Sequence, residues 1–248
     1  MQFSTSQLAW MQSLIDEHHV LAGDLTDQHS AWFLRNNDAP TRGDGNHVRR
    51  IRNGADIDIF FAAIEAHYAH LPFRSVRCDW FTPPPVEARL LAEDYQSQIE
   101  IVMGADGSLG GKPAAVEIRT VGCDSPDLAR LVKLDSGEEW SGVWALIQRR
   151  ADAFTWYVAY EDGQPAGHFS QRTRDGLGYL ESLFVDPAYR LRGIATALTH
   201  YAAAAARAEG AKVVFLPAAA DDTPKAMYRG MGFVPVYAFR NYWKTVTP

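Results

Sequence analysis

The chain has 248 residues, of which 47% are hydrophobic and 22% charged, a composition typical of a globular protein with one large domain or two small ones. Its net charge of −6 argues against a nucleic-acid-binding protein, because phosphate binding usually requires a stripe of basic residues. The N-terminus lacks the basic start and apolar stretch of a signal peptide, and no segment approaches the ~20 apolar residues of a membrane span. We therefore expect a soluble, cytoplasmic protein that binds neither nucleic acid nor membrane.

The chain contains two cysteines, Cys78 and Cys123. They indicate reduced thiols in a cytosolic protein, with a single disulfide or one nucleophilic cysteine as the alternatives. No group of Cys and His residues has the spacing of a zinc site, so the sequence predicts no bound metal. Candidate functional residues must therefore be sought in other patterns.

Composition changes most clearly at Gly104–Pro113, where four glycines, an Asp, a Ser and a Pro occur within ten residues. Such a run is typical of a linker or an exposed loop. We therefore divide the chain into a smaller N-terminal α/β domain over residues 1–110 and a second domain over residues 114–248. The polar segment Asn36–Asn46, with one proline and two glycines, predicts another loop.

The elements of the first domain follow from the spacing of its apolar residues. Ile57, Phe60 and Ile64 fit one face of a helix. Ser97–Met103 alternates well enough to predict a strand. In chain order we predict a helix over Ser6–Ala22, a helix over Ile57–His70, a strand over Ser75–Trp80, a helix over Val86–Glu93 and a strand over Ser97–Met103.

The second domain has clearer boundaries. Asp-Gly pairs at residues 162–163 and 175–176 predict hairpin turns, Ser125 with Pro126 predicts a helix start, and Gly210 predicts a helix end. In chain order we predict a strand over Ala115–Thr120, a helix from Ser125, a helix over Trp140–Arg150, strands over Phe154–Tyr160, Gln164–Arg172 and Gly178–Val185, an Ala-rich helix to Glu209, a strand over Lys212–Leu216, a helix over Asp222–Met231 and a strand pair over Gly232–Thr245. This order predicts a mixed sheet with helices on its faces.

The segment Val185–Thr196 carries the strongest functional pattern. A strand ends, a turn with a proline follows, and Gly193 stands where the long helix begins. A helix start has backbone N–H groups without intrahelical partners, and its dipole favours an anion. Gly193 and Ala195 leave room for a diphosphate, and Arg190 and Arg192 can add charge-assisted hydrogen bonds. The pattern predicts a phosphate-binding turn, with a capped helix and two solvated arginines as the alternative.

The run Arg190-Leu-Arg-Gly-Ile-Ala195 resembles the acyl-CoA signature of the GNAT superfamily of N-acetyltransferases, Arg/Gln-x-x-Gly-x-Gly/Ala. The preceding Leu183–Pro187 is similar to the family strand that splays from its neighbour. The resemblance implies a mostly antiparallel, splayed sheet and acetyl-CoA as cosubstrate. It further implies that Leu183, Phe184 and Val185 bind the pantetheine arm. The residues that it places at the pyrophosphate are Arg190, Leu191, Arg192, Gly193, Ile194, Ala195 and Thr196.

The segment Asp221–Phe233 resembles a second family pattern, Asn-x-x-Ala-x-x-Leu-Tyr-x-x-x-Gly-Phe. Tyr228 matches the tyrosine near the cofactor sulfur, which implies that it protonates the departing thiolate. A phenol with a pKa of about 10 is protonated at neutral pH. Asp221 stands where the family usually has Asn, so it keeps an acceptor for a cofactor contact but loses the amide donor. Asp222 is the alternative neighbour, and simple helix packing is the alternative role for Tyr228.

In the family, a carboxylate on the strand before the phosphate loop often takes the proton of the amine. Glu181 is the only acid on the corresponding strand, and we predict that it is the general base. Strand alternation places it on one face with Leu183 and Val185. A solvent-facing or ion-paired Glu181 is the alternative. The candidate residues for the acceptor site are Tyr179, His168 and Ser170, of which His168 is alternatively a structural residue.

These patterns together imply an enzyme that moves an acetyl group from acetyl-CoA directly to the primary amine of a small molecule, as a monomer or homodimer. Acetylation of a protein lysine or N-terminal amine is one alternative, and a non-catalytic acyl-CoA-binding regulatory module is another. Residues 50–103 resemble the second half of a GNAT domain without its phosphate loop. We therefore expect a degenerate GNAT-like N-terminal half, with an unrelated helical cap as the alternative.

Overall fold

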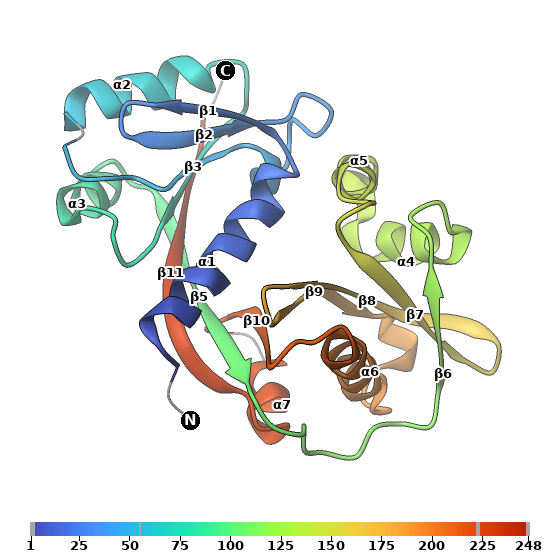
Figure 1. The fold of residues 1–248 in the computed structure, drawn as a ribbon. Coiled ribbons are helices and arrows are strands. Elements are labelled where there is room, and N and C mark those ends of the chain that lie inside the picture. Colours follow the sequence, from blue (N-terminus) through green and yellow to red (C-terminus); the bar gives the residue numbers. More distant parts are fainter. Residues whose placement is uncertain (1–2, 55, 222–223, 247–248) are drawn as a thin grey trace.

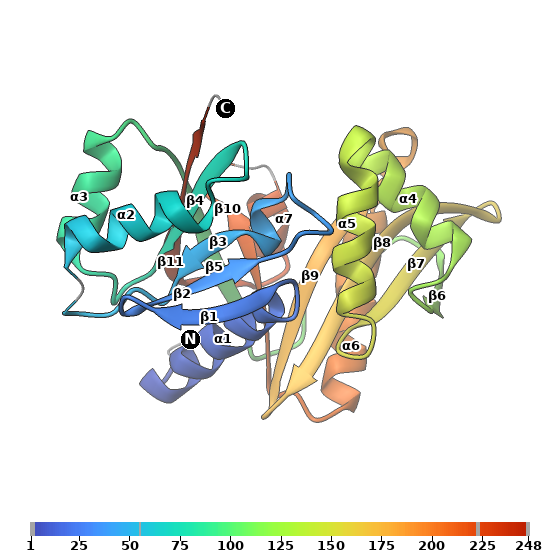
Figure 2. The same ribbon diagram turned by 90° about the horizontal axis from the view of Figure 1, so that it is seen from above.

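The computed structural model describes residues 3–54, 56–221 and 224–246. Within this part of the chain, eleven strands form one continuous sheet, with helices against its faces (Figures 1 and 2). All but two of the neighbouring strand pairs are antiparallel. The fold class expected from the sequence, a mixed and mostly antiparallel sheet flanked by helices, is confirmed.

The N-terminal half contains the helices and the last two strands that the sequence predicts, together with three strands that it does not. Its elements are α1 (Thr5–Val20), β1 (Asp24–Gln28), β2 (Ala31–Arg35), β3 (His47–Arg49), α2 (Ile57–His67), β4 (Phe73–Cys78), α3 (Pro84–Ala92) and β5 (Gln96–Ala105). The strands β1, β2 and β3 escape prediction because β1 is polar and almost wholly exposed, β2 does not alternate, and β3 has only three residues.

The C-terminal half follows the predicted order closely. Its elements are β6 (Glu117–Val121), α4 (Pro126–Ser136), α5 (Trp140–Arg149), β7 (Thr155–Glu161), β8 (Gln164–Arg174), β9 (Leu177–Val185), α6 (Ile194–Ala208), β10 (Val213–Ala219), α7 (Pro224–Gly230) and β11 (Val234–Thr245). The Ser125 hydroxyl caps α4 by accepting from the Leu128 N–H at 3.4 Å. Both predicted Asp-Gly turns have left-handed backbone, with φ of 50° and 74° at residues 162–163 and 51° and 76° at residues 175–176.

The strand pair predicted over Gly232–Thr245 is wrong, because this segment is the single long strand β11. A bulge between Pro235 and Tyr237 bends it without breaking it. It remains one strand because it has a partner on each side, β5 along most of its length and β4 along its second half.

The two halves repeat one succession of elements. In the N-terminal half, three antiparallel strands (β1, β2, β3) are followed by α2, by β4 parallel to β3, by α3 and by β5. In the C-terminal half, β7, β8 and β9 are followed by α6, by β10 parallel to β9, by α7 and by β11. Residues 50–103 thus have the order of helix, strand, helix and strand expected from the sequence, and their assignment to a degenerate GNAT-like half stays a prediction.

The halves exchange their last strands. The order across the sheet is β1-β2-β3-β4-β11-β5-β10-β9-β8-β7-β6. The strand β5 therefore pairs with β10 of the other half, β11 pairs with β4, and the two exchanged strands pair with each other at the centre. Figure 1 shows both running side by side through the middle of the molecule. The division of the chain near residue 110 stays a prediction, since the two segments share one sheet.

Three large groups of buried apolar side chains fix the layers. One lies between the sheet and α1, α4 and α5, with Met11, Leu128 and Trp156 among its members. A second lies under α6 and α7, and a third belongs to the N-terminal half around Phe33 and Phe60. In Figure 1, α4 and α5 lie on one side of β7–β9 and α6 lies on the other. None of the helices in the described ranges combines the length and apolarity that crossing a membrane requires.

Candidate active site

The sheet opens between β9 and β10. These parallel strands pair only at Leu177–Val213, Gly178–Val214 and Tyr179–Phe215. Beyond these pairs, β9 continues along β8 and β10 continues along β5, so the two strands diverge. A cavity of about 230 Å³ lies at this opening. The splayed sheet expected from the sequence is therefore present.

A bulge in β9 at Ser182 decides which side chains face which layer. Ser182 has a φ of 60°, and the register with β8 shifts between the pairs His168–Phe184 and Ser170–Glu181. An extra residue in one strand reverses the alternation beyond it. The predicted common face of Glu181, Leu183 and Val185 is therefore wrong.

The side chains before and after this bulge lie on opposite faces of the sheet. Leu183 and Val185 pack with the cluster under α6. Glu181 instead shares the opposite face with Tyr179, as the sequence predicts for that pair, because the Tyr179 hydroxyl donates to its carboxylate at 2.8 Å. The bulge thus puts Glu181 on the opposite face from Leu183 and Val185, two of the residues for which the sequence resemblance implies contact with pantetheine.

The cavity extends through the sheet, because it is lined from both faces. Leu183 and Tyr228 line it from the α6 side. Glu181 lines it from the other side, together with Glu100 of β5. The remaining lining residues are Phe169, Leu180, Ser182, Leu216, Pro217, Ala218, Ala219 and Pro224. A reacting group in this opening can therefore be approached from two directions.

Glu181 is partly buried, with 22% of its side chain exposed. Burial, more than any other cause, raises the pKa of its carboxyl to about 7. The negative charges of Asp44 and Glu100 act in the same direction on this pKa, whereas the Tyr179 hydrogen bond and the positive charge of Arg150 oppose them. A carboxylate with a pKa near neutrality is suited to general base catalysis.

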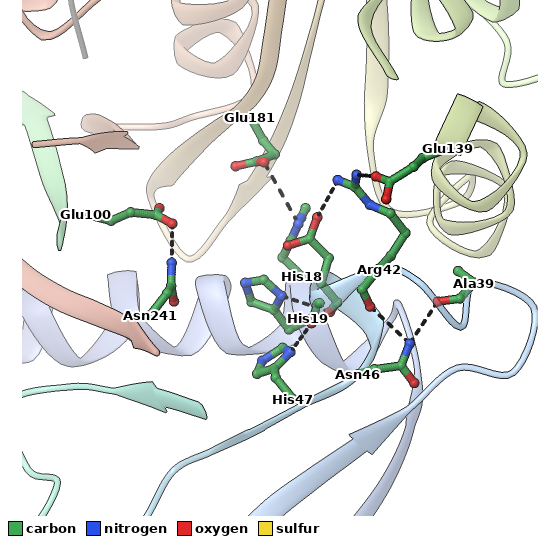
Figure 3. Close-up of polar contacts among 12 residues, drawn as sticks. His18, His19, Ala39, Arg42, Asn46, His47, Glu100, Glu139, Glu181 and Asn241 are labelled. Atoms are coloured by element: carbon green, nitrogen blue, oxygen red, sulfur yellow. Dashed lines mark hydrogen bonds and ion pairs between the residues drawn. The ribbon is translucent and has the colours of Figure 1, made fainter. Parts of the chain in front are cut away.

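The end of α1 lies beside Glu181 (Figure 3). The Nε2 atom of His18 is 4.0 Å from the Glu181 carboxylate. Burial, together with the positive charges of Arg150 and Arg77, holds the pKa of His18 well below its usual range, so the ring is neutral at neutral pH. The Glu181 carboxylate therefore has a polar but uncharged neighbour on this side.

Three histidines, His18, His19 and His47, stack edge to face in this region, with 4.9 Å between the ring centroids of each successive pair. Within the described ranges, no group of His, Cys, Asp and Glu side chains has the arrangement of a metal site. We therefore treat these rings as hydrogen-bonding groups.

The turn before α6 leaves backbone donors free. Gly193 precedes the helix with a left-handed φ of 83°, and no side chain caps it. The first backbone hydrogen bond of the helix runs from the Ala197 N–H to the Gly193 carbonyl at 3.0 Å. No described residue accepts a hydrogen bond from the N–H groups of residues 191–196. Free backbone donors at a helix start can bind an anion such as a diphosphate.

The remaining residues of the turn lie around these donors. Leu191 has a φ of 64° and a fully exposed side chain. The Arg190 Nε donates to the Val185 carbonyl at 3.1 Å. Arg192 is ion-paired with Glu161 at 3.2 Å and also donates to the Ala188 carbonyl. Both arginines thus hold the turn in shape at the protein surface, beside the predicted phosphate position.

The segment after Asp221 places one aromatic residue at the cavity. Tyr228 on α7 is 5% exposed, lines the cavity and packs against Phe233 with 5.7 Å between ring centroids. Asp221 is exposed, and its carboxylate accepts from the Gln98 amide at 3.4 Å. Asp222, the alternative cofactor neighbour, lies outside the described residues.

The predicted acceptor residues on β8 lie in the core instead of at the cavity. His168 is 3% exposed and packs between Trp156 and Phe184, where burial lowers its pKa to about 4. The Ser170 hydroxyl donates to the Glu181 carbonyl at 3.0 Å. Ser170 therefore supports the strand at the bulge. Cys78 and Cys123 are free thiols, as the sequence predicts.

A second, larger pocket of about 530 Å³ adjoins the first, since Glu100 lines both. We call it the polar pocket. Its lining residues are Thr41, Arg42, Gly43, Asp44, His47, Phe73, Ser75, Arg77, Gln98, Glu100, Asn241 and Trp243. The sequence indicates only that residues 36–46 form a polar loop. Of the other lining residues, His47 begins β3 and the rest come from β4, β11 and β5, whose adjacency depends on the strand exchange and gives no local sequence signal.

Comparisons with known proteins agree with this geometry. Residues 126–233 match the model of the acetyltransferase (GNAT) family. A GCN5-related N-acetyltransferase from Kribbella flavida shares the fold with a TM-score of 0.71 and 16% identity, over 95% of each chain. A conserved protein of unknown function from Staphylococcus epidermidis has a TM-score of 0.70 and 16% identity, over 92% of this chain and 96% of its own.

A tandem GNAT protein from the clavulanic acid biosynthesis pathway has a TM-score of 0.61 and 17% identity, over 88% of this chain and 79% of its own. No curated protein matches the sequence. The similarity to these solved structures shows the fold, and the match to the family model shows the type of domain. The chain thus contains an acetyltransferase domain of the GNAT family, and that domain covers residues 126–233.

Proposed function

We propose that the protein is an N-acetyltransferase that transfers an acetyl group from acetyl-CoA to the primary amine of a small molecule. The observation that carries this proposal is a single cavity through the sheet with Glu181 on one side and Tyr228 on the other. The cavity lies at the end of the strand that leads into the uncapped start of α6. Donor and acceptor can then meet from opposite faces of the sheet.

The residues of the turn and of β9 fit a coenzyme A molecule. The N–H groups of residues 191–196 have no acceptor among the described residues and would hold the diphosphate. The backbone of Leu183–Val185, beyond the last pair between β9 and β10, would hold the pantetheine arm. When bound, acetyl-CoA supplies the acetyl group as a thioester, whose C–S bond breaks as the amine nitrogen bonds to the acetyl carbon.

Glu181 is the proposed general base, supported by its position at the cavity and by its raised pKa. An amine attacks only in its neutral form, so its ammonium proton must leave. At neutral pH a carboxyl with a pKa of about 7 is substantially ionised and basic enough to accept that proton. Tyr179, which precedes the bulge on β9, orients the Glu181 carboxylate through its hydrogen bond. Tyr179 acts here through Glu181, as a positioning residue.

Tyr228 is the proposed general acid. Its side chain lines the cavity from the α6 side, opposite Glu181. A phenol hydroxyl there can donate its proton to the departing thiolate sulfur. The proton that the attacking nitrogen loses as the amide forms returns to the Tyr228 phenolate, and the proton that Glu181 took from the ammonium passes to solvent. Bound reactants held in this geometry also benefit from proximity, which reduces the entropic part of the barrier.

Two measurements test the proposal. Acetyl-CoA at 100 times its Kd should stabilise the protein by about 2.7 kcal/mol in thermal unfolding. A panel of small amines should then release free thiol from acetyl-CoA in the presence of the protein. Absence of stabilisation by millimolar acetyl-CoA would refute the cofactor site. Stabilisation without thiol release from any amine would favour a non-catalytic binding module, and release only with lysine-containing or N-terminal peptides would favour a protein substrate.

A further inference from the structure

The polar pocket is built on one face of three adjacent strands. Alternate residues of β4, β11 and β5 form its floor, and its wall is formed by the loop between β2 and β3 together with His47, the first residue of β3. The floor residues are Phe73, Ser75, Arg77, Asn241, Trp243, Gln98 and Glu100. Glu100 is two residues from Val102, which packs in the cluster on the α1 side of the sheet. The pocket therefore opens on the same face of the sheet as Glu181.

Arg77 places a positive charge in this pocket without a matching negative one. The residue is only 9% exposed, and no described carboxylate lies within 4.0 Å of its guanidinium. Its Nε donates to the Asn241 side-chain oxygen at 2.7 Å, and its Nη1 contacts the neutral ring of His19. A buried charge is normally paired, so this guanidinium is suited to receive an anion from a ligand.

Glu100 provides the opposite charge at the end of the pocket nearest the transfer cavity. The Asn241 side-chain amide donates to its carboxylate, so that one amide group bridges Arg77 and Glu100. Glu100 has no ion pair with any described residue. Figure 3 shows the Glu100–Asn241 contact on one side of the α1 end, with Glu181 above it and the loop that bears Arg42 on the other side.

His47 adds an unpaired buried atom to the wall. It is 2% exposed, and its Nδ1 lies 2.8 Å from the Gly43 carbonyl, which makes Nδ1 the protonated nitrogen. Its Nε2 is then an acceptor, and no described residue bonds to it. The atom lies in a residue that lines the pocket, so it can accept a hydrogen bond from a polar ligand.

From these features we infer that the polar pocket binds the acceptor, and that the acceptor is an amino-acid-like zwitterion. Its carboxylate is held by Arg77, and its amine passes Glu100 toward Glu181. This inference rests on the proposed acetyl transfer for the fate of the amine, but not for binding. A ligand with one positive and one negative group fits the two unpaired charges, whereas a polyamine leaves the Arg77 charge unmatched and a dicarboxylate leaves that of Glu100 unmatched.

Binding is tested without acetyl-CoA. The probes are the twenty common L-amino acids and the α-amide of each, which differ from them only by loss of the negative charge. By calorimetry, at least one amino acid should bind, and its amide should bind at least tenfold more weakly. In Arg77→Gln this preference should fall to less than threefold. The matched control Arg240→Gln removes an arginine of β11 that pairs with Glu87 and lines neither pocket, so its preference should match that of the wild type.

A second variant keeps Arg77, so the inference stays testable if Arg77→Gln does not fold. Glu100→Gln should weaken binding of the same amino acid at least fivefold while the preference for acid over amide persists. Equal binding of acids and amides by the wild-type protein, or binding of neither set, overturns the inference. Binding of an amino acid without its acetylation leaves the inference intact and refutes the proposed function. Efficient acetylation of the amides supports the proposed function and overturns the inference.

Discussion

The two halves contain the same succession of strands and helices, but their corresponding helices begin differently. The helix α6 follows Gly193, which has a left-handed φ and no capping side chain. The helix α2 follows Asp56, whose carboxylate accepts from the Ile59 N–H at 3.1 Å. A carboxylate at a helix start occupies the free donors and repels a second anion. Of these two corresponding helices, only α6 therefore has the uncapped start that we propose as the phosphate site.

The openings between the parallel strands differ in the same sense. The strands β3 and β4 pair only at Val48–Val76, and Arg50 just beyond has a φ of 51°, comparable to Ser182 in β9. There, Arg49 and Arg50 both form ion pairs with Asp16 of α1, so charged side chains of the N-terminal half fill this region. In the C-terminal half the corresponding region is a cavity. An opening between two parallel strands can therefore become a binding site only where no side chains of the protein fill it.

The strongest way to break this comparison is to remove the charge that fills the N-terminal opening. Asp16 is almost wholly buried, pairs with Arg49 and Arg50, and accepts from the Gln12 amide at 2.9 Å. Asp16→Asn leaves the buried Arg49 and the partly buried Arg50 without this counter-ion and should destabilise the protein by about 3–5 kcal/mol in denaturant unfolding. The exposed pair Asp27–Arg52 provides the control, since Asp27→Asn should cost less than about 1 kcal/mol. Similar losses in both variants would contradict the expected structural role.

Removing the carboxylate of the C-terminal opening should affect catalysis. Glu181→Gln should lower kcat/KM by about 10²–10³-fold, the range of general base catalysis. In the wild-type protein the carboxyl must be deprotonated, so activity should fall as pH drops through about 7, and this limb should vanish in the variant. The measurement is the pH dependence of kcat/KM. An unchanged limb would remove Glu181 from the role of base.

The same substitution should raise stability at high pH. The folded-state pKa of Glu181 lies above the ordinary value of 4.5, at about 7. The native state therefore binds more protons than the unfolded state between these values, and the protein loses stability as pH rises through them. Glu181→Gln abolishes this loss, so relative to wild type it should gain up to about 3 kcal/mol between pH 4 and pH 8. A constant difference between the two proteins over this range would show that burial of Glu181 is not costly.

Giving α6 the kind of start that α2 has should weaken cofactor binding. Gly193→Asp places a carboxylate at the uncapped turn, and we expect about 100-fold weaker binding of acetyl-CoA by calorimetry. Gly193→Asn is the matched control, because Asn has nearly the same size and tolerates left-handed backbone without adding charge. It should bind at least tenfold more tightly than the Asp variant. Equal affinities in the two variants would mean that the effect is steric and not electrostatic.

The smallest effect is expected at the acid. Tyr228→Phe should lower kcat about 10-fold and leave the Kd of acetyl-CoA within about threefold of the wild-type value, because only the proton donor is lost. Tyr201→Phe, on the exposed surface of α6, is the control and should behave as wild type. A tenfold loss of affinity with normal turnover would instead assign Tyr228 to cofactor binding.

The elements around the turn could be predicted because their signals are local. Ser125, the two Asp-Gly pairs and Gly193 each act on the neighbouring residues, and the structure has the expected caps and turns at these positions. The face of Glu181 could not be predicted, because the extra residue at Ser182 depends on the register with β8. Simple alternation along the strand gives no sign of it.

The polar pocket depends on contacts that are distant in the chain. Arg77 and Asn241 are hydrogen-bonded but lie 164 residues apart in sequence. Their proximity follows from the insertion of β11 between β4 and β5, which no local pattern indicates. The short strands β1, β2 and β3 are likewise defined by partners more than by their own residues. Sequence patterns therefore identify the proposed cofactor side of the site more readily than the proposed acceptor side.

The insertion of β11 between β4 and β5 also constrains how the chain can fold during synthesis. Until the segment Val234–Thr245 has left the ribosome, β4 and β5 each lack a neighbour and expose unpaired backbone groups. Such open edges promote pairing with other chains, and contacts between distant segments form slowly. The first half is therefore translated well before its sheet can close. It stays open to pairing with other chains until β11, the last strand, has been made.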